Sequence, residues 1–259
     1  MQILIAWHAL LILLLVSSAT AETKTNRERV GLIGAVQTVT TVTTIAGRVG
    51  ERVVSHYDAN GHETEVVRYN DANVLMERSA HTYNATGYRI ETTTKNAADE
   101  LLTRTLYLYD LQGRLNEMTT LDGAGIIDKT TYTYDMNKHT VDETTTYTHR
   151  SITVRVTRWY DKKGQETQSF TFGRGSSVTK TTFAYDPTGN LTERRVYAVD
   201  GALLDHLRYT YEFDAVGNWI SQTELLCNPS NESTTDSCTP TAVVTRTITY
   251  AGQKNPDVQ

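Results

Sequence analysis

The sequence YDPTGNLTERRVYAVDG, from Tyr185 to Gly201, holds one copy of the unit that repeats along this chain. Asp186 opens a type I turn when its side chain accepts hydrogen bonds from the backbone ahead, and Gly189 accepts the positive φ that closes the hairpin with a bulge. Asp200-Gly201 forms a second turn at the opposite edge, and the runs between the turns are typical of strands. One unit is therefore two antiparallel strands and two turns.

The turn motif occurs about seven times. Its aromatic residue recurs at intervals of 26, 26, 25, 26, 25 and 28 residues, and a glycine stands three residues after the Asp or Asn in every copy except one, where Lys138 replaces it. The copies are Tyr57-Asp58 with Gly61, Tyr83-Asn84 with Gly87, Tyr109-Asp110 with Gly113, Tyr134-Asp135, Tyr160-Asp161 with Gly164, Tyr185-Asp186 with Gly189, and Phe213-Asp214 with Gly217. A period of this length is typical of a repeat architecture.

The fold predicted from this repeat is all-β. The tandem hairpins are expected to form one elongated, twisted or curled antiparallel sheet of about sixteen strands, with turns along both long edges. The second turns are expected at Asn70–Asn73, Asn96–Asp99, Asp122–Gly125, Gly173–Ser176 and Asp200–Gly201. A sheet of this kind buries little surface, so a homodimer formed through a sheet face is an open alternative.

The chain divides into four segments. Residues 1–21 contain no Asp, Glu, Lys or Arg and end in Ala19-Thr20-Ala21, which predicts a secretory signal peptide cleaved before Glu22 and a secreted or periplasmic protein. Residues 22–56 include a degenerate first repeat, residues 57–250 form the repeat domain, and residues 251–259 are a C-terminal tail. No segment of the mature chain is long and apolar enough to predict a membrane-spanning helix.

The only two cysteines, Cys227 and Cys238, lie in a polar loop of the last repeat and predict one local disulfide in an exported protein. Two isolated thiols do not make a zinc site, and the histidines form no column, so we expect no metal and no cofactor. The net charge is −5, with no run of basic residues, which argues against nucleic acid as a partner.

Stacking the units places side chains in two columns. An aromatic column stands two residues before the turn tyrosines and on their face of the sheet, and its candidate ligand-binding members are Tyr107, Tyr132, Phe183 and Tyr211. An acidic column stands eight residues after each tyrosine, at Glu65, Glu91, Glu117, Asp142, Gln168, Glu193 and Ser221. Either these columns hold the repeats together, or they form an aromatic and acidic surface suited to sugars.

The strings YDPTGNLTERRVYAVDG, YDLQGRLNEMTTLDG from Tyr109 and FDAVGNWISQTE from Phe213 resemble the YD repeat of Rhs-type proteins. The resemblance covers nearly all of the mature chain and implies a β-strand repeat architecture and export. The large members coil into a hollow shell that encloses a C-terminal toxin. This chain has fewer repeats, and only AGQKNPDVQ follows Tyr250.

The function predicted from the sequence is an exported, non-enzymatic scaffold or binding protein of the cell envelope or extracellular space, with a carbohydrate or an envelope protein as partner. Two alternatives are a glycan-processing enzyme that uses carboxylates of the acidic column and an orphan fragment of an Rhs toxin shell. An outer-membrane barrel is disfavoured, because charges occupy both faces of the strands, as at Arg114 and Glu117.

Overall fold

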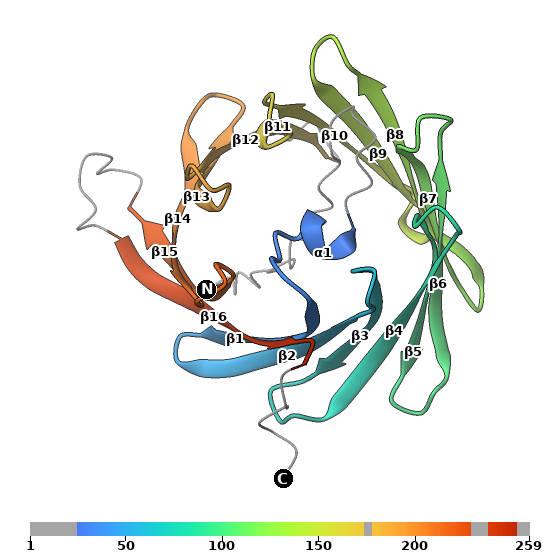
Figure 1. The fold of residues 1–259 in the computed structure, drawn as a ribbon. Coiled ribbons are helices and arrows are strands. Elements are labelled where there is room, and N and C mark those ends of the chain that lie inside the picture. The colour runs from blue at the N-terminus through green and yellow to red at the C-terminus, as the bar shows by residue number, and fades with distance from the viewer. Residues whose placement is uncertain (1–24, 174–177, 229–237, 253–259) are drawn as a thin grey trace.

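The computed structural model describes residues 25–173, 178–228 and 238–252. The expected signal peptide and most of the C-terminal tail lie outside these residues. The described chain is a single closed antiparallel barrel, with a short helix, α1 (Asn26–Arg29), inside the ring of strands (Figure 1). A 3-10 turn, η1 (Thr148–Arg150), joins two of the strands. The sixteen strands are β1 (Val36–Ile45), β2 (Arg48–Tyr57), β3 (Glu63–Tyr69), β4 (Leu75–Tyr83), β5 (Arg89–Asn96), β6 (Leu101–Tyr109), β7 (Leu115–Asp122), β8 (Gly125–Asp135), β9 (Thr140–Tyr147), β10 (Ile152–Tyr160), β11 (Glu166–Phe172), β12 (Val178–Tyr185), β13 (Leu191–Ala198), β14 (Leu203–Phe213), β15 (Trp219–Cys227) and β16 (Cys238–Tyr250).

The all-β antiparallel prediction is confirmed, but the predicted open sheet is wrong. Each strand pairs with its neighbours in the sequence, and β1 also pairs with β16, from Val36 opposite Tyr250 to Ile45 opposite Ala242. Closure satisfies the backbone groups that two edge strands would have left open. Closure also makes one face of the sheet line the lumen. The homodimer considered from the sequence could therefore form only through the outer face.

The tip turns, defined as the turns that carry the Asp or Asn and glycine motif, have the hydrogen bonds expected from the sequence. At Asp186 the Oδ1 atom accepts from the Asn190 amide at 2.9 Å, and the Gly189 amide donates to the Asp186 carbonyl at 3.1 Å. Gly189 has a φ of 100°, and the corresponding glycines of the other copies are also positive. Where Lys138 replaces glycine, the positive φ moves to His139, at 52°.

Each glycine-containing tip turn is followed by a bulge that changes which face the next residues occupy. Tyr57 pairs with Glu63, whereas the preceding residue His56 pairs with Glu65, so one residue of β3 is left out of the register. Directly paired residues share a face and neighbours along a strand face opposite ways. Glu63 therefore lies on the face of Tyr57, and Glu65 lies on the other face.

The segment from α1 to β1 identifies the lumen-facing side. This segment lies inside the ring (Figure 1), and its Leu32 packs in the buried cluster that contains Val36, Val39 and Tyr57. The face of Tyr57 is therefore the lumen face. By register, the tip tyrosines and the aromatic column face the lumen, and the acidic column faces outward.

Asn218 connects three parts of the chain at the point of closure. Its side chain is only 1% exposed, accepts a hydrogen bond from the Ile33 amide at 2.7 Å, and donates to the Ile33 carbonyl at 2.9 Å and to the Tyr250 hydroxyl at 2.6 Å. The Tyr250 hydroxyl in turn donates to Asp214. One side-chain amide thus holds together the segment between α1 and β1, the last tip turn and the end of β16.

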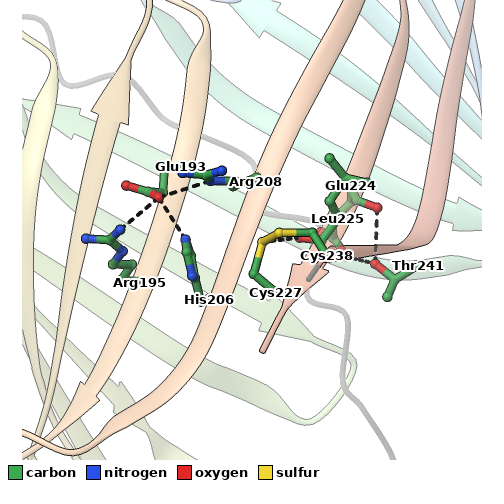
Figure 2. The surroundings of a disulfide bond; sticks show 9 residues. All are labelled: Glu193, Arg195, His206, Arg208, Glu224, Leu225, Cys227, Cys238 and Thr241. Atoms are coloured by element: carbon green, nitrogen blue, oxygen red, sulfur yellow. Dashed lines mark hydrogen bonds and ion pairs between the residues drawn. A yellow bond between two sulfur atoms is a disulfide. The ribbon is translucent and has the colours of Figure 1, made fainter. Parts of the chain in front are cut away.

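The predicted disulfide is confirmed, because Cys227 and Cys238 are bonded at the facing ends of β15 and β16 (Figure 2). The bond joins the two strands that flank the long last loop.

We expect Asn218→Ala to lower the free energy of unfolding by about 2 kcal/mol, because it removes the two part-buried hydrogen bonds to the Ile33 backbone and the bond to the Tyr250 hydroxyl. Asn190→Ala is the matched control, since Asn190 holds the same position in the preceding copy and its amide bonds only Asp186 and Thr188 of its own turn. Urea denaturation measures both. Equal losses in the two variants would mean that Asn218 has no special role in closure.

Replacing both cysteines by alanine should lower the free energy of unfolding by about 3 kcal/mol, because the unfolded chain regains the entropy of the open loop. The comparison is with the oxidised parent in the same denaturant series. An unchanged midpoint would show that the disulfide does not stabilise the barrel.

Candidate functional site

The lumen face carries a ladder of tyrosine hydroxyls that join consecutive hairpins. In each case the hydroxyl donates to a backbone carbonyl of the preceding hairpin. The bonds are Tyr83 to Glu63 at 2.6 Å, Tyr109 to Arg89 at 2.8 Å, Tyr134 to Leu115 at 2.7 Å and Tyr211 to Leu191 at 2.8 Å. Burial raises the pKa of the Tyr109 hydroxyl to about 12, so the hydroxyl stays protonated and remains a donor. The tip tyrosines are therefore part of the barrel wall.

In the last repeat, Tyr211 occupies the structural position of a tip tyrosine, where Phe213 was expected. It makes the same carbonyl bond as the tip tyrosines, and Phe213 follows it in a strand extended toward the turn. Tyr211 stands 26 residues after Tyr185, as the regular repeat requires, so the sequence did contain a signal for this assignment.

The candidate ligand-binding aromatics lie on the lumen face, where their hydroxyls are engaged. The Tyr107 hydroxyl is 3.1 Å from Thr92 Oγ1, and Tyr132 is 7% exposed with its hydroxyl 3.4 Å from the sulfur of Met118. Phe183 is half-buried, and the Tyr211 hydroxyl accepts from Gln222 at 2.8 Å. The hydroxyls of the three tyrosines are therefore engaged by groups of the barrel wall.

Charged clusters that the sequence analysis missed also face the lumen. Glu63 binds Arg89 at 2.9 Å and lies 3.5 Å from His81 Nε2, and Arg158 bridges Glu143 and Glu166 at 3.2 and 3.1 Å. Glu63, Arg89 and Glu166 all stand six residues after a tip tyrosine. This position pairs directly with the tip tyrosine and therefore shares its lumen face, and that spacing was the available signal.

The acidic column forms a belt of ion pairs on the outer face. Each acid meets a basic residue of the following strand: Arg78 with Glu65 at 3.4 Å, Arg104 with Glu91 at 2.6 Å, Lys129 with Glu117 at 2.8 Å, Arg155 with Asp142 at 3.2 Å, and Arg208 with Glu193 at 3.4 Å. We call these five pairs the outer belt. Threonine hydroxyls also donate to it, as from Thr119 to Glu117 at 3.0 Å.

Three acids of the outer belt, Glu91, Glu117 and Glu193, have a lowered pKa. Hydrogen bonds from Arg104 and Lys129 lower the pKa of Glu91 and Glu117. Burial opposes the shift at Glu193, but the hydrogen bond from His206 and the charge of Arg195 lower its pKa as well (Figure 2). A general acid in glycoside hydrolysis needs a raised pKa, which is the opposite direction to the shift at these three acids.

The outer belt is interrupted at Gln168. Beside it a hollow of about 260 Å³ lies on the outer face, and its lining includes Phe170, Lys180, Tyr197 and Val199. Phe170 pairs with Lys180 and Lys180 pairs with Tyr197, so the three share the outer face.

Within the described ranges, no group of three or more His, Cys, Asp or Glu side chains is arranged to hold a metal ion. No helix of the described chain is both long and apolar enough to cross a membrane.

The fold and its two faces define a closed sixteen-stranded barrel with a tyrosine-lined lumen and a charged outer belt. The barrel is similar to a porin-like protein from Bacteroides vulgatus, with 12% sequence identity, 85% of this chain and 99% of that chain covered, and a TM-score of 0.52. This likeness shows a shared barrel fold.

Two further solved structures are less similar. A porin-like protein from Bacteroides uniformis matches at 11% identity over 84% of this chain and 99% of that one, with a TM-score of 0.42. A chain of the TcdB2-TccC3-Cdc42 complex matches at 12% identity over 84% of this chain and 16% of that one, with a TM-score of 0.31. No family model and no curated protein matches the sequence, so the relation to YD repeats remains a resemblance.

The buried His81 imidazole predicts a pH dependence. Burial, with the nearby charge of Arg89, lowers its pKa to about 3, and Glu63 is already paired with Arg89. The unfolded chain binds a proton near pH 6.5 and the folded one does not, so stability falls as the pH drops below 6.5 and continues to fall toward 3. Relative to His81→Gln, the parent should lose up to about 2 kcal/mol between pH 7 and 5.

Unfolding free energies measured across this range check the prediction, with His149→Gln as the control at an exposed histidine. Parallel pH profiles for the parent and His81→Gln would contradict it.

Proposed function

We propose that this protein is an exported, non-catalytic binding barrel that works in an aqueous compartment of the cell envelope or outside the cell. Its ligand, for which we propose a carbohydrate, enters the lumen. The observation that carries the proposal is the distribution of side chains on the outer face. In the described residues, charged pairs lie near the middle of the outer face, and every exposed large apolar side chain of the barrel stands in a turn or near the end of a strand.

The outer belt lies near the middle of the strands. Arg78 is the fourth residue of β4, Arg104 the fourth of β6, and Arg155 the fourth of β10. A charged Arg or Lys facing lipid at the bilayer midplane costs about 2–4 kcal/mol, and lipid-facing barrels have a continuous apolar band at this height. The belt therefore favours water around the barrel.

The exposed large apolar side chains lie elsewhere. In the described chain, each of those belonging to the barrel stands in a turn or within the first two or last two residues of a strand. They are Ile45, Val49, Val74, Met76, Ile90, Leu101, Leu102, Leu108, Leu111, Ile126, Met136, Tyr147, Phe172, Val199, Leu204, Phe213, Val216 and Leu226. This is the reverse of a membrane barrel, whose apolar band is central and whose ends are polar.

The lumen supports binding as the activity. A closed barrel of sixteen strands is wide enough to leave an aqueous channel, and its concave inner face presents aromatic rings beside polar groups, the usual lining of a ligand site. Export is supported by the disulfide, which forms and persists in oxidising compartments.

A vesicle experiment tests whether the barrel is surrounded by water or by lipid. The chain beginning at Glu22 should stay monodisperse without detergent, fail to float with phospholipid vesicles and produce no conductance in a planar bilayer. Glu91→Leu/Arg104→Leu, which removes one pair of the outer belt, should float more than the parent. Stable insertion of the parent with ion conductance would overturn the proposal in favour of a pore.

A glycan-array screen tests the lumen as the binding surface. Tyr107→Ala should weaken saturable binding by about tenfold, the scale expected when one aromatic contact is lost. Tyr197→Ala, which removes an aromatic ring from the outer face, should leave binding unchanged. Circular dichroism confirms that both variants are folded. Loss of binding in Tyr197→Ala alone would place the ligand on the outer hollow.

A further inference from the structure

Arg246 differs from the other arginines that face the lumen from the strands. Arg68 is bound by Glu51 and Glu77, Arg89 by Glu63, Arg158 by Glu143 and Glu166, and Arg194 by Asp205. Arg246 of β16 faces the lumen opposite Thr41 of β1, and no carboxylate of the described residues lies within ion-pair distance of it. It is the one member of this set whose charge is unbalanced.

Trp219 fixes the position of Arg246. The guanidinium carbon lies 3.4 Å from the centroid of the indole ring, and the Nε atom is buried without a hydrogen-bond partner. A guanidinium stacked in this way keeps its terminal amino groups in the plane of the fork, where they can donate in parallel to an oxyanion. Stacking restrains the side chain while its terminal donors stay available.

The surroundings of Arg246 are aromatic and uncharged. Tyr211 contacts Trp219 edge to face at 6.0 Å, and Gln222 donates to the Tyr211 hydroxyl at 2.8 Å. Burial lowers the pKa of Arg246 to about 10, and the hydroxyls of Tyr57 and Tyr211 oppose this shift. An arginine remains cationic at neutral pH under this shift, so a partly desolvated positive charge is present without a counter-ion from the wall.

We propose that Arg246, held on Trp219, binds the oxyanion group of an acidic solute, a carboxylate or a phosphate ester, within the lumen. This inference rests on the proposed lumen-binding function and names its ligand class as acidic rather than neutral sugars. The guanidinium supplies two parallel donors to the oxyanion, and Tyr211 and Gln222 line the approach.

The fluorescence of Trp219 can report ligand binding at Arg246. Trp159 lies on the outer face beside Phe170, so Trp159→Phe leaves Trp219 as the reporter in the chain beginning at Glu22. Titration with D-glucuronate and with glucose 6-phosphate should change the indole emission saturably, whereas neutral glucose should not. The two acidic probes distinguish a carboxylate from a phosphate ligand.

Arg246→Gln should weaken binding of the acidic probe by at least about tenfold, since it removes the charge and the fork. Arg246→Lys should retain part of the affinity, and Arg104→Gln of the outer belt should retain all of it. Unchanged affinity in a folded Arg246→Gln protein, or equal affinity for glucose and glucuronate, would overturn the site.

Thr41→Asp tests the same site without removing Arg246. Direct cross-strand partners are close enough for an ion pair, so the new carboxylate should neutralise Arg246, raise the melting temperature and abolish binding of the acidic probe. Full binding by Thr41→Asp would contradict the inference.

The two proposals can fail separately. Neutral glycans bound in a Tyr107-dependent way with no effect of Arg246→Gln would overturn this site and leave the lumen-binding function standing. Insertion into vesicles would overturn the proposed function.

Discussion

The bulge after each glycine-containing tip turn is the constraint on which the structure depends. The positive φ of the turn glycine leaves one residue of the next strand out of register, and every residue beyond it changes face. Without the bulge, Glu63 and Glu65 would lie on the same face of the sheet. The separation of lumen clusters from the outer belt therefore follows from one backbone conformation repeated along the chain.

The tyrosine ladder and the outer belt connect the same hairpins on opposite faces. Tyr109 joins its hairpin to the preceding one through a carbonyl inside, and Arg104 joins the same strand to Glu91 outside. Exposed ion pairs contribute little stability each, whereas buried hydrogen bonds that close a backbone group contribute more. We therefore assign stability mainly to the lumen ladder.

Local features of this fold could be predicted from the sequence and long-range features could not. The Asp and Gly spacing specified the turns, and the strand number and disulfide followed from the repeat and the cysteine pair. Closure depends on β1 meeting β16, more than 190 residues away, and no repeat unit encodes the total number of strands. The contacts of Asn218 were missed because its position in the repeat resembles that of Asn190.

The candidate site, like the fold, could be predicted from the sequence only in its local features. The acidic column was recognised, but its basic partners stand 20 to 23 residues after the tip tyrosines and form a column of their own, which also includes Lys180. The unbalanced charge of Arg246 could not be read from the sequence, because only closure shows which carboxylates lie around it.

Pairing of the first strand with the last has a consequence for the order in which the chain is synthesised and folds. Residues 36–45 emerge early, yet their second partner at residues 238–250 arrives only after almost all the rest. Until then a growing sheet has two open edges, each of which is a template for pairing with another chain. A truncation before β16 would leave both edges permanently open, because it removes the closure that covers them.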